Sequence, residues 1–208
     1  MALERGTIVA AALRLLDEVG LDGLTLRRLA TDLGVQAPAL YWHFKNKQEL
    51  LDAMAAAMSS AHPRRRPLDD PARWREWIAD YARGERAMLN SHRDGARLAA
   101  GTKPTDEMFG LVELAVEALE RAGFAAADAF SGLFAVTNFV AGFTLEEQAE
   151  RTRPDTDDHP DLVAFQARYP RMMAWLIETG DPQGDDSFEA SLALILDGMS
   201  QRLAGAGT

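Results

Sequence analysis

Three aromatic residues stand in a row at Tyr41, Trp42 and His43, and lysines follow at Lys45 and Lys47. Neighbouring residues of a helix point about 100° apart, so these three rings cannot all face one core. Exposed aromatic rings beside ammonium groups suit contact with the phosphates, sugars and base edges of DNA. The cluster therefore indicates DNA binding. The alternative is a hairpin of core helices whose aromatic residues face a neighbouring domain.

Two short helices and a tight turn are predicted to position this cluster. The first helix has an apolar stripe at helical spacing, formed by Leu26, Leu29, Ala30 and Leu33. Thr25 can cap its start, and Gly34 stands where a left-handed residue commonly ends a helix. A second helix follows with Pro38 in its first turn, where proline is tolerated. This order of helix, glycine turn and helix is that of a DNA-reading helix-turn-helix.

Three segments resemble the TetR family of regulators, and in particular its tetracycline-repressor subgroup. They are GLTLRRLATDLGVQAPALYWHFKNKQELLDAM from Gly23 to Met54, SHRDGARLAAGTKPT from Ser91 to Thr105, and FVAGFTLEEQ from Phe139 to Gln148. The resemblance reaches from near the start of the chain to about residue 150 and is looser in the last helix. It implies a repressor of double-stranded operator DNA, with a small-molecule effector and homodimer formation assigned to the C-terminal part.

The resemblance also implies which residues contact DNA. They are Thr25, Arg27, Gln36, Ala37, Pro38, Ala39, Tyr41, Trp42, His43 and Lys47. The tetracycline repressors have Gln and Thr at the positions of Ala37 and Ala39. A glutamine can make paired hydrogen bonds to adenine, whereas alanine offers only apolar contact, for instance with a thymine methyl group. We therefore expect a palindromic operator whose sequence differs from the tetracycline operator.

Charge is distributed unevenly along the 208 residues, which carry a net charge of −10. Residues 1–66 hold nine Lys/Arg and seven Asp/Glu, a net +2, so the rest of the chain carries −12. A mildly basic head on an acidic body favours selective over tight non-specific DNA binding. The sequence has no cysteine, no signal-peptide pattern and no run of eighteen apolar residues. We therefore expect a cytoplasmic protein with no membrane partner.

The absence of any long period-two strand pattern predicts an all-α fold. Besides the two helices of the helix-turn-helix, the expected helices cover residues 8–19, 46–62, about 71–90, 106–121, 126 to about 148, 162–178 and 187–203. Glycines and a proline should keep any helix between Arg93 and Pro104 short. The predicted organisation is a helix-turn-helix DNA-binding domain over residues 1–46, a linking helix and linker over 47–66, and a ligand-binding and dimerisation domain over 67–208.

The predicted helices at 126–148 and 187–203 are apolar on all sides, so one chain cannot cover both of their faces with its own core. Two such helices from each of two subunits can form an intermolecular four-helix bundle. The sequence therefore favours a homodimer, in agreement with the family resemblance.

The effector of the tetracycline repressors is a magnesium chelate of the drug, whose metal is held by a histidine and, through water, by a glutamate. This chain keeps Thr102 and has Glu146 at the glutamate position, but it has Ala99 where the histidine would be. Imidazole is the main direct protein ligand to that metal, and an alanine cannot replace it. We therefore expect no metal, no cofactor, and an effector other than Mg-tetracycline.

Other drug-contacting positions of those repressors are changed as well. The predicted effector site comprises Tyr81, Glu85, Thr102, Met108, Ala115, Phe134, Asn138, Glu146 and Met172. A few polar groups in an apolar wall suit a medium-sized, partly aromatic molecule that carries a hydroxyl or an amine. For Glu85 and Glu146 the alternative is ordinary solvent-exposed helix surface.

The resemblance further implies that the segment from Arg93 to Pro104 moves when the effector binds, and that it swings the helix predicted from Asn46 to His62. This segment is delimited by two glycines and a proline, at Gly95, Gly101 and Pro104. Short elements between such residues can change position at low cost, as a switch requires.

Several sequence features have a second interpretation. The run DTDDHPD at residues 155–161 could be a metal site or a diphosphate-binding motif, but it lacks calcium-loop spacing and favours a solvated loop. The basic run Arg64–Arg66 could touch phosphate, although a solvated linker is favoured. The chain has no catalytic cysteine or serine motif and only four histidines, none at metal spacing, so we predict no enzyme. The alternative function is a helical enzyme or small-molecule-binding protein with a degenerate DNA-binding head.

Overall fold

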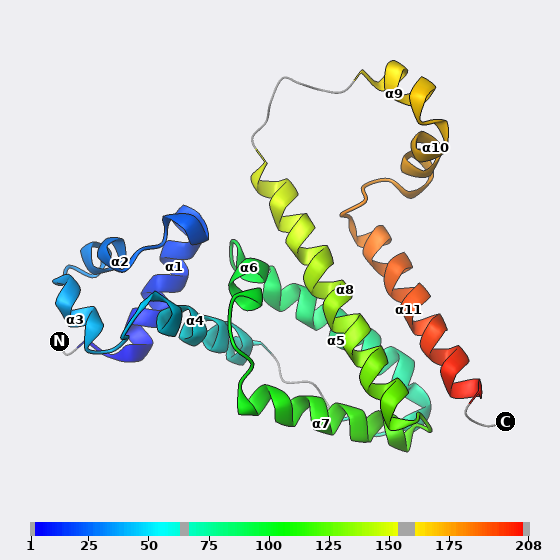
Figure 1. The fold of residues 1–208 in the computed structure, drawn as a ribbon, viewed down its shortest axis with the longest axis horizontal. Coiled ribbons are helices and arrows are strands. Elements are labelled where there is room, and N and C mark those ends of the chain that lie inside the picture. The colour runs from blue at the N-terminus through cyan, green and yellow to red at the C-terminus, as the bar shows by residue number, and fades with distance from the viewer. Residues whose placement is uncertain (1–2, 63–66, 154–160, 206–208) are drawn as a thin grey trace.

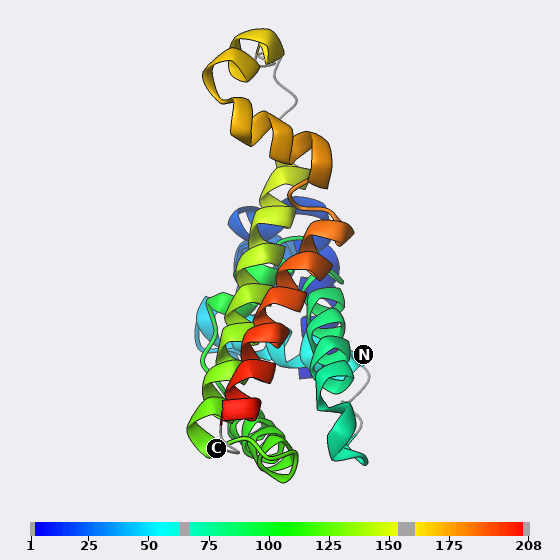
Figure 2. The ribbon, with the colours of Figure 1, turned by 90° about the vertical axis from the view of Figure 1, so that its right-hand side faces the viewer.

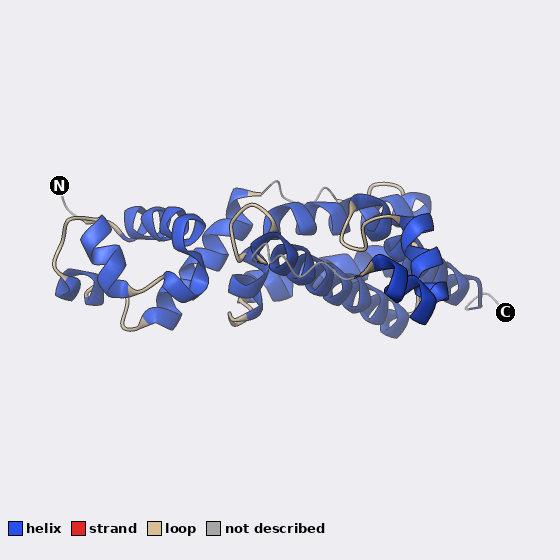
Figure 3. Cartoon of the chain, turned by 90° about the horizontal axis from the view of Figure 1, so that it is seen from above, coloured by secondary structure: helices blue, strands red, loops and turns tan. Residues whose placement is uncertain are grey.

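The computed structural model describes residues 3–62, 67–153 and 161–205, and every regular element in these ranges is a helix (Figure 3). This confirms the all-α prediction. The first group of helices, which we call the head, comprises α1 (Arg5–Gly23), α2 (Leu26–Asp32), α3 (Ala37–Tyr41) and α4 (Lys47–Ala61). The second group, which we call the body, comprises η1 (Pro71–Arg73), α5 (Trp74–Leu89), α6 (Gly95–Ala100), α7 (Asp106–Arg121), α8 (Ala126–Thr152), α9 (Leu162–Arg168), α10 (Pro170–Thr179) and α11 (Asp185–Gly205).

The head folds around its own hydrophobic core, and its helix ends follow the predicted signals. The Thr25 Oγ1 accepts a hydrogen bond of 3.1 Å from the backbone N–H of Arg28, as an N-cap should. Gly34 has φ 66°, the left-handed conformation that glycine adopts without steric cost. The helix-turn-helix is therefore present, with its first helix capped as predicted, but α3 ends at Tyr41, so Trp42 and His43 lie in the turn after it rather than on the helix.

The first helix extends beyond its predicted end. Gly20, where the helix was predicted to end, has φ 71° and ψ 173°, so the helix kinks there, but helical hydrogen bonding resumes and α1 ends at Gly23. The backbone N–H of Leu24 bonds to the Gly20 carbonyl at 3.1 Å. The glycine thus marks a kink with one further turn rather than the end of the helix.

The body is built around α8, which runs beside α5, α7 and α11 (Figures 1 and 2). Leu133, Val136 and Val140 of α8 lie in a core that also holds Ile78 of α5 and Phe188 of α11. The helices at 106–121 and the short helix between 93 and 104 match their predictions, and α8 extends four residues past the predicted end.

The prediction of a single helix over residues 162–178 is wrong, because the structure has two helices there. Tyr169 between them has φ −131° and ψ 61°, outside the helical region. Proline disfavours helical geometry in the residue before it and cannot donate to the preceding turn, so Pro170 ends α9 and begins α10. We call α9 and α10 the arm, since they stand away from the rest of the body beyond the ends of α8 and α11 (Figures 1 and 2).

Large apolar side chains remain exposed on the two helices predicted to be apolar on all sides. They include Phe130 and Phe134 on α8 and Leu194 on α11, with exposed fractions of 52%, 61% and 73%. Within the described ranges, α8 is the single helix whose length and composition would also fit a membrane span, a test that the core helix of a soluble protein also passes. The basic run Arg64–Arg66 and residues 155–160 of the acidic loop lie outside the described residues.

Candidate functional site

The reading helix α3 is anchored on one side and exposed on the other. Leu40 and Phe44 are fully buried in the head core, whereas Tyr41 and Trp42 are 54% and 89% exposed. An almost fully exposed tryptophan has no packing role in the free chain, so the interpretation as a hairpin of core helices is not supported. The exposed aromatic surface is available for a partner.

The other predicted DNA contacts lie around this surface. Thr25, Arg27, Gln36 and Pro38 are exposed, and Ala37, Ala39, His43 and Lys47 are half-buried. The Lys47 ammonium donates to the Leu21 carbonyl at 3.3 Å, which uses one of its three donors. The structure thus brings the ten residues to one part of the head, and their DNA contacts stay predictions.

The helix α6 joins the head to the body by packing into the head. Its Leu98 is 1% exposed and belongs to the hydrophobic core of the head. In the opposite direction, Met58 near the end of α4 belongs to the core of the body. The head and the body therefore each contribute one side chain to the hydrophobic core of the other.

Hydrogen bonds reinforce this junction on the side of the head. The Asp94 Oδ2 accepts a bond of 2.7 Å from the backbone N–H of Leu21, directly after the Gly20 kink. The Arg97 guanidinium pairs with the Asp22 carboxylate at 3.0 Å, which lowers the pKa of Asp22. The Gln48 amide of α4 donates to the Gly101 carbonyl at 2.9 Å. A movement of α6 must therefore carry α1 and α4 with it or break these contacts.

On the side of the body, α6 is fixed to α8 by one buried amide. The Gln148 Oε1 accepts a hydrogen bond of 3.1 Å from the backbone N–H of Ala96 in the first turn of α6. Its Nε2 donates to the Leu89 carbonyl at the end of α5, at 2.8 Å. One side chain of α8 thus holds both ends of the α5–α6 turn.

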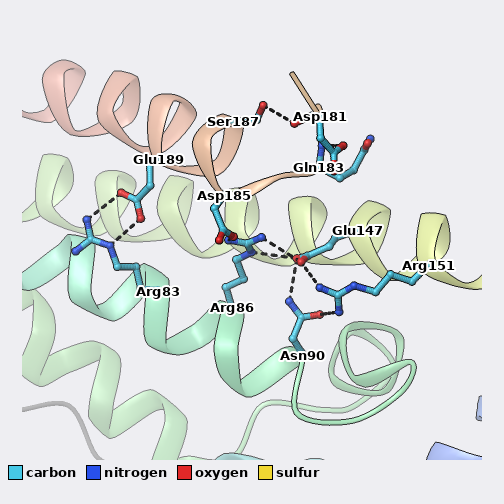
Figure 4. Close-up of polar contacts among 10 residues, drawn as sticks. All are labelled: Arg83, Arg86, Asn90, Glu147, Arg151, Asp181, Gln183, Asp185, Ser187 and Glu189. Carbon is cyan, nitrogen blue, oxygen red and sulfur yellow. Dashed lines mark hydrogen bonds and ion pairs between the residues drawn. The ribbon is translucent and has the colours of Figure 1, made fainter. Parts of the chain in front are cut away.

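The neighbouring Glu147 is the centre of a buried ionic network (Figure 4). Its carboxylate accepts two hydrogen bonds of 3.0 Å from Arg86 and one of 2.9 Å from Asn90, and it also pairs with Arg151. Arg86 in addition pairs with Asp185 at the start of α11, at 2.8 Å. The network therefore ties α5, α8 and α11 together.

Burial alone would raise the pKa of Glu147, but the hydrogen bonds from Arg86 and Asn90 outweigh it, so the pKa is lowered. The Arg86 guanidinium also lies over the ring of Phe188, 4.6 Å from its centroid. Sequence reasoning missed Glu147 and Gln148. They lie in the polar C-terminal part of α8, beside Glu146, Glu150 and Arg151, so the sequence did not distinguish them from exposed residues; once buried, such groups require partners.

The predicted effector residues differ widely in how far they are buried. Tyr81 is half-buried and its hydroxyl lies 3.2 Å from the Thr137 Oγ1, while Ala115 is 2% exposed in the body core. The remaining positions range from half-buried (Glu85, Thr102) to exposed (Met108, Phe134, Asn138, Glu146, Met172). Two hollows of about 350 and 300 Å³ lie elsewhere, one in the arm and one beside Glu147, and neither is lined by these residues.

The residues around Ala99 do not fit the magnesium ion that the family resemblance implies. The Ala99 methyl group packs against the body core, and the Thr102 hydroxyl donates to the Ala99 carbonyl at 2.8 Å. Glu146 is exposed, and among the residues that the structure describes no three His, Cys, Asp or Glu side chains form a group that could hold a metal ion. Hard divalent cations need several oxygen or imidazole ligands, and this position offers neither set.

Comparison with known proteins agrees with this architecture. The family model described as "Bacterial regulatory proteins, tetR family" matches residues 8–54, and "Tetracyclin repressor-like, C-terminal domain" matches residues 66–203. The chain is 43% identical over 204 residues to the class A tetracycline repressor protein from transposon 1721 of Escherichia coli, covering 96% of this chain and 92% of that protein.

Two solved structures have the same fold. A possible TetR family transcriptional regulator from Streptomyces coelicolor A3(2) matches with a TM-score of 0.80 and 38% identity, over 95% of this chain and 99% of that one. TetR(class A) in complex with 5a,6-anhydrotetracycline and magnesium matches with a TM-score of 0.72 and 37% identity, over 96% of this chain and 99% of the other.

Proposed function

This chain belongs to the TetR family of bacterial regulatory proteins and is a DNA-binding transcription regulator, and we propose that it is a repressor whose effector is not a magnesium–tetracycline chelate. The observation that carries the proposal is the position of α6. Leu98 of this helix packs in the core of the head, while Gln148 of α8 holds its first turn in the body. A change in the body is thereby transmitted to the helices that present Trp42. We further propose that the protein is cytoplasmic and has no enzymatic activity.

Operator recognition provides the first test. We expect a gel shift with DNA from the region flanking the gene, and a weaker shift with the tetracycline operator because of Ala37 and Ala39. Arg27→Ala should lose discrimination between operator and unrelated DNA. Lys47→Ala should weaken binding to the operator and to unrelated DNA about equally. It should also reduce the slope of log K for DNA binding against log[salt] by about 0.9.

Lys103→Ala is the matched control, since Lys103 is an exposed lysine of the body. It should change neither affinity nor slope. A helical enzyme or ligand carrier with a degenerate head would bind none of these DNA fragments with sequence preference, and that result would refute the proposed function.

We infer that the effector site is completed when two subunits associate. The exposed residues Met108 and Phe134 come from the neighbouring helices α7 and α8, whereas Met172 comes from the arm, which stands away from both helices (Figure 1). In the homodimer, the exposed faces of α8 and α11 are the natural contact between subunits, because apolar surfaces of this size are stabilised by burial. We propose that the partner's arm then covers the predicted site.

Release of the repressor from its operator by the effector should not depend on magnesium. A ligand with about 3 kcal/mol of coupling would weaken operator binding roughly 150-fold. The repressor–operator complex can be titrated with a panel of aromatic natural products, including anhydrotetracycline, with Mg²⁺ and with EDTA. We expect the same release curve in both buffers, and Ala99→His is the variant in which metal dependence would be regained. Release by the unaltered protein that requires Mg²⁺ would contradict the assignment of Ala99.

A further inference from the structure

The reading helix α3 has five residues, and helices of this length do not persist without external contacts. Leu40 and Phe44 bury one side of it. Residues 42–46 connect its C-terminal end to α4, and residues 43–45 form the middle of this connection. The orientation of Tyr41 and Trp42 therefore depends on what fixes those three residues.

Arg5, the first residue of α1, contacts two of them. Its Nη1 donates to the His43 carbonyl at 2.7 Å. Its guanidinium also lies 4.2 Å from the centroid of the Phe44 ring, within the range of a cation–π interaction. Arg5 is therefore bound to the backbone directly after the exposed aromatic residues, although it is thirty-eight positions away in the chain.

Glu49 holds Arg5 in this place and fixes the third residue. Its Oε1 lies 3.2 Å from the Arg5 Nη1, and its Oε2 accepts a hydrogen bond of 2.9 Å from the backbone N–H of Lys45. The hydrogen bond from Lys45 and the one from Arg5 lower the pKa of Glu49, so the carboxylate remains ionised at neutral pH. Glu49 is itself positioned by its own N–H, which donates to the Asn46 cap at 2.9 Å.

We propose that Arg5 and Glu49 form a clamp that orients the end of the reading helix, so that the pair determines operator specificity without touching the bases. The proposal rests on the proposed DNA-binding function of this head. A clamp differs from a phosphate contact in a measurable way. The Arg5 charge is already paired with a carboxylate, so it contributes little to counterion release, whereas the geometry it imposes affects only contacts with the correct bases.

The decisive comparison uses two variants of opposite charge change. Arg5→Ala removes a positive charge and Glu49→Gln removes a negative one. We expect both to weaken operator binding roughly tenfold, as the loss of a charge-assisted hydrogen bond predicts. Binding to unrelated DNA and the slope of log K against log[salt] should stay unchanged for Arg5→Ala. The double variant should be no weaker than either single variant, because both act on one clamp.

Arg5→Lys separates geometry from charge. Lysine keeps the positive charge but lacks the planar fork that bonds two acceptors at once, so we expect it to restore little of the lost affinity. Arg14→Ala is the charge-matched control on the same helix, since Arg14 is exposed on α1. Thermal unfolding of each variant, followed by circular dichroism, establishes that the head is folded at the assay temperature.

A purely electrostatic role would give the opposite pattern. Arg5→Ala would then lower the salt slope by about 0.9, Arg5→Lys would restore binding, and Glu49→Gln would bind all DNA more tightly. That pattern would overturn the clamp while leaving the proposed function intact. Failure of the unaltered protein to bind any operator would instead overturn the proposed function.

Discussion

Glu147→Leu is expected to lower the free energy of unfolding by about 3–5 kcal/mol, the usual cost of removing one partner from a buried ion pair. Glu147 is 6% exposed and holds Arg86, Asn90 and Arg151 at once. The substitution removes the buried carboxylate that balances the Arg86 charge and leaves only the exposed Asp185 as its partner, where α5, α8 and α11 meet. Chemical denaturation at a fixed protein concentration measures the loss, because subunit association also contributes to stability.

Glu150→Gln is the matched control on the same helix. Glu150 pairs with Arg153 at 2.7 Å on the surface, with side-chain exposures of 49% and 68%. Exposed pairs of this kind contribute at most about 1 kcal/mol. A similar loss for Glu147→Leu and Glu150→Gln would show that the buried network does not stabilise the body.

The same carboxylate gives the stability a defined pH dependence. The folded-state pKa of Glu147 lies below its ordinary value of 4.5, so the ionised form is favoured by folding. This stabilisation is complete above pH 4.5 and is lost as the pH falls through the lower, folded-state pKa. The difference in stability between the natural protein and Glu147→Leu should therefore be constant near neutral pH and shrink below about pH 4.5. A difference that grows on acidification would contradict the assigned pairing.

Local features of the fold could be predicted because their causes lie within a few residues. Thr25, Gly34 and Asn46 act on the adjacent helix ends, and each is found in its expected role. The error at Pro170 had a local cause as well, since proline restricts the residue before it. At Gly20 the sequence indicated the end of the helix, whereas the structure has a kink there and one further turn after it.

The contacts that join head and body could not be predicted in the same way. Asp94 accepts a hydrogen bond from a residue seventy-three positions earlier, and Gln148 bonds to the end of a helix fifty-nine positions earlier. Such pairs become visible only when the helices are packed. The effector site is a harder case still, because its predicted residues, such as Phe134 and Met172, are exposed in the single chain, and we propose that a second subunit completes the site.

Leu98→Ala is expected to uncouple the head from the body. Leu98 belongs to α6 but is buried in the head core, so truncation leaves a cavity at the junction, and such cavities cost about 2–5 kcal/mol. Two heads of a homodimer must span successive major grooves, roughly 34–36 Å apart. A looser junction broadens the distribution of distances between the two heads. Only the fraction of dimers whose heads have the correct spacing binds the operator, so the operator affinity falls in proportion to that fraction.

The spread can be measured without knowing the effector. The chain has no cysteine, so Ala10→Cys, at an exposed site of α1, places one spin label on each head. Pulsed electron–electron double resonance should give a narrow distribution of distances between the two spin labels for the natural junction and a broad one for Leu98→Ala. Leu16→Ala is the control, because Leu16 is buried in the same core but lies within the head. If both variants leave the distribution equally narrow, α6 does not fix the heads, and coupling must run through the hydrogen bonds of Asp94 and Gln48 instead.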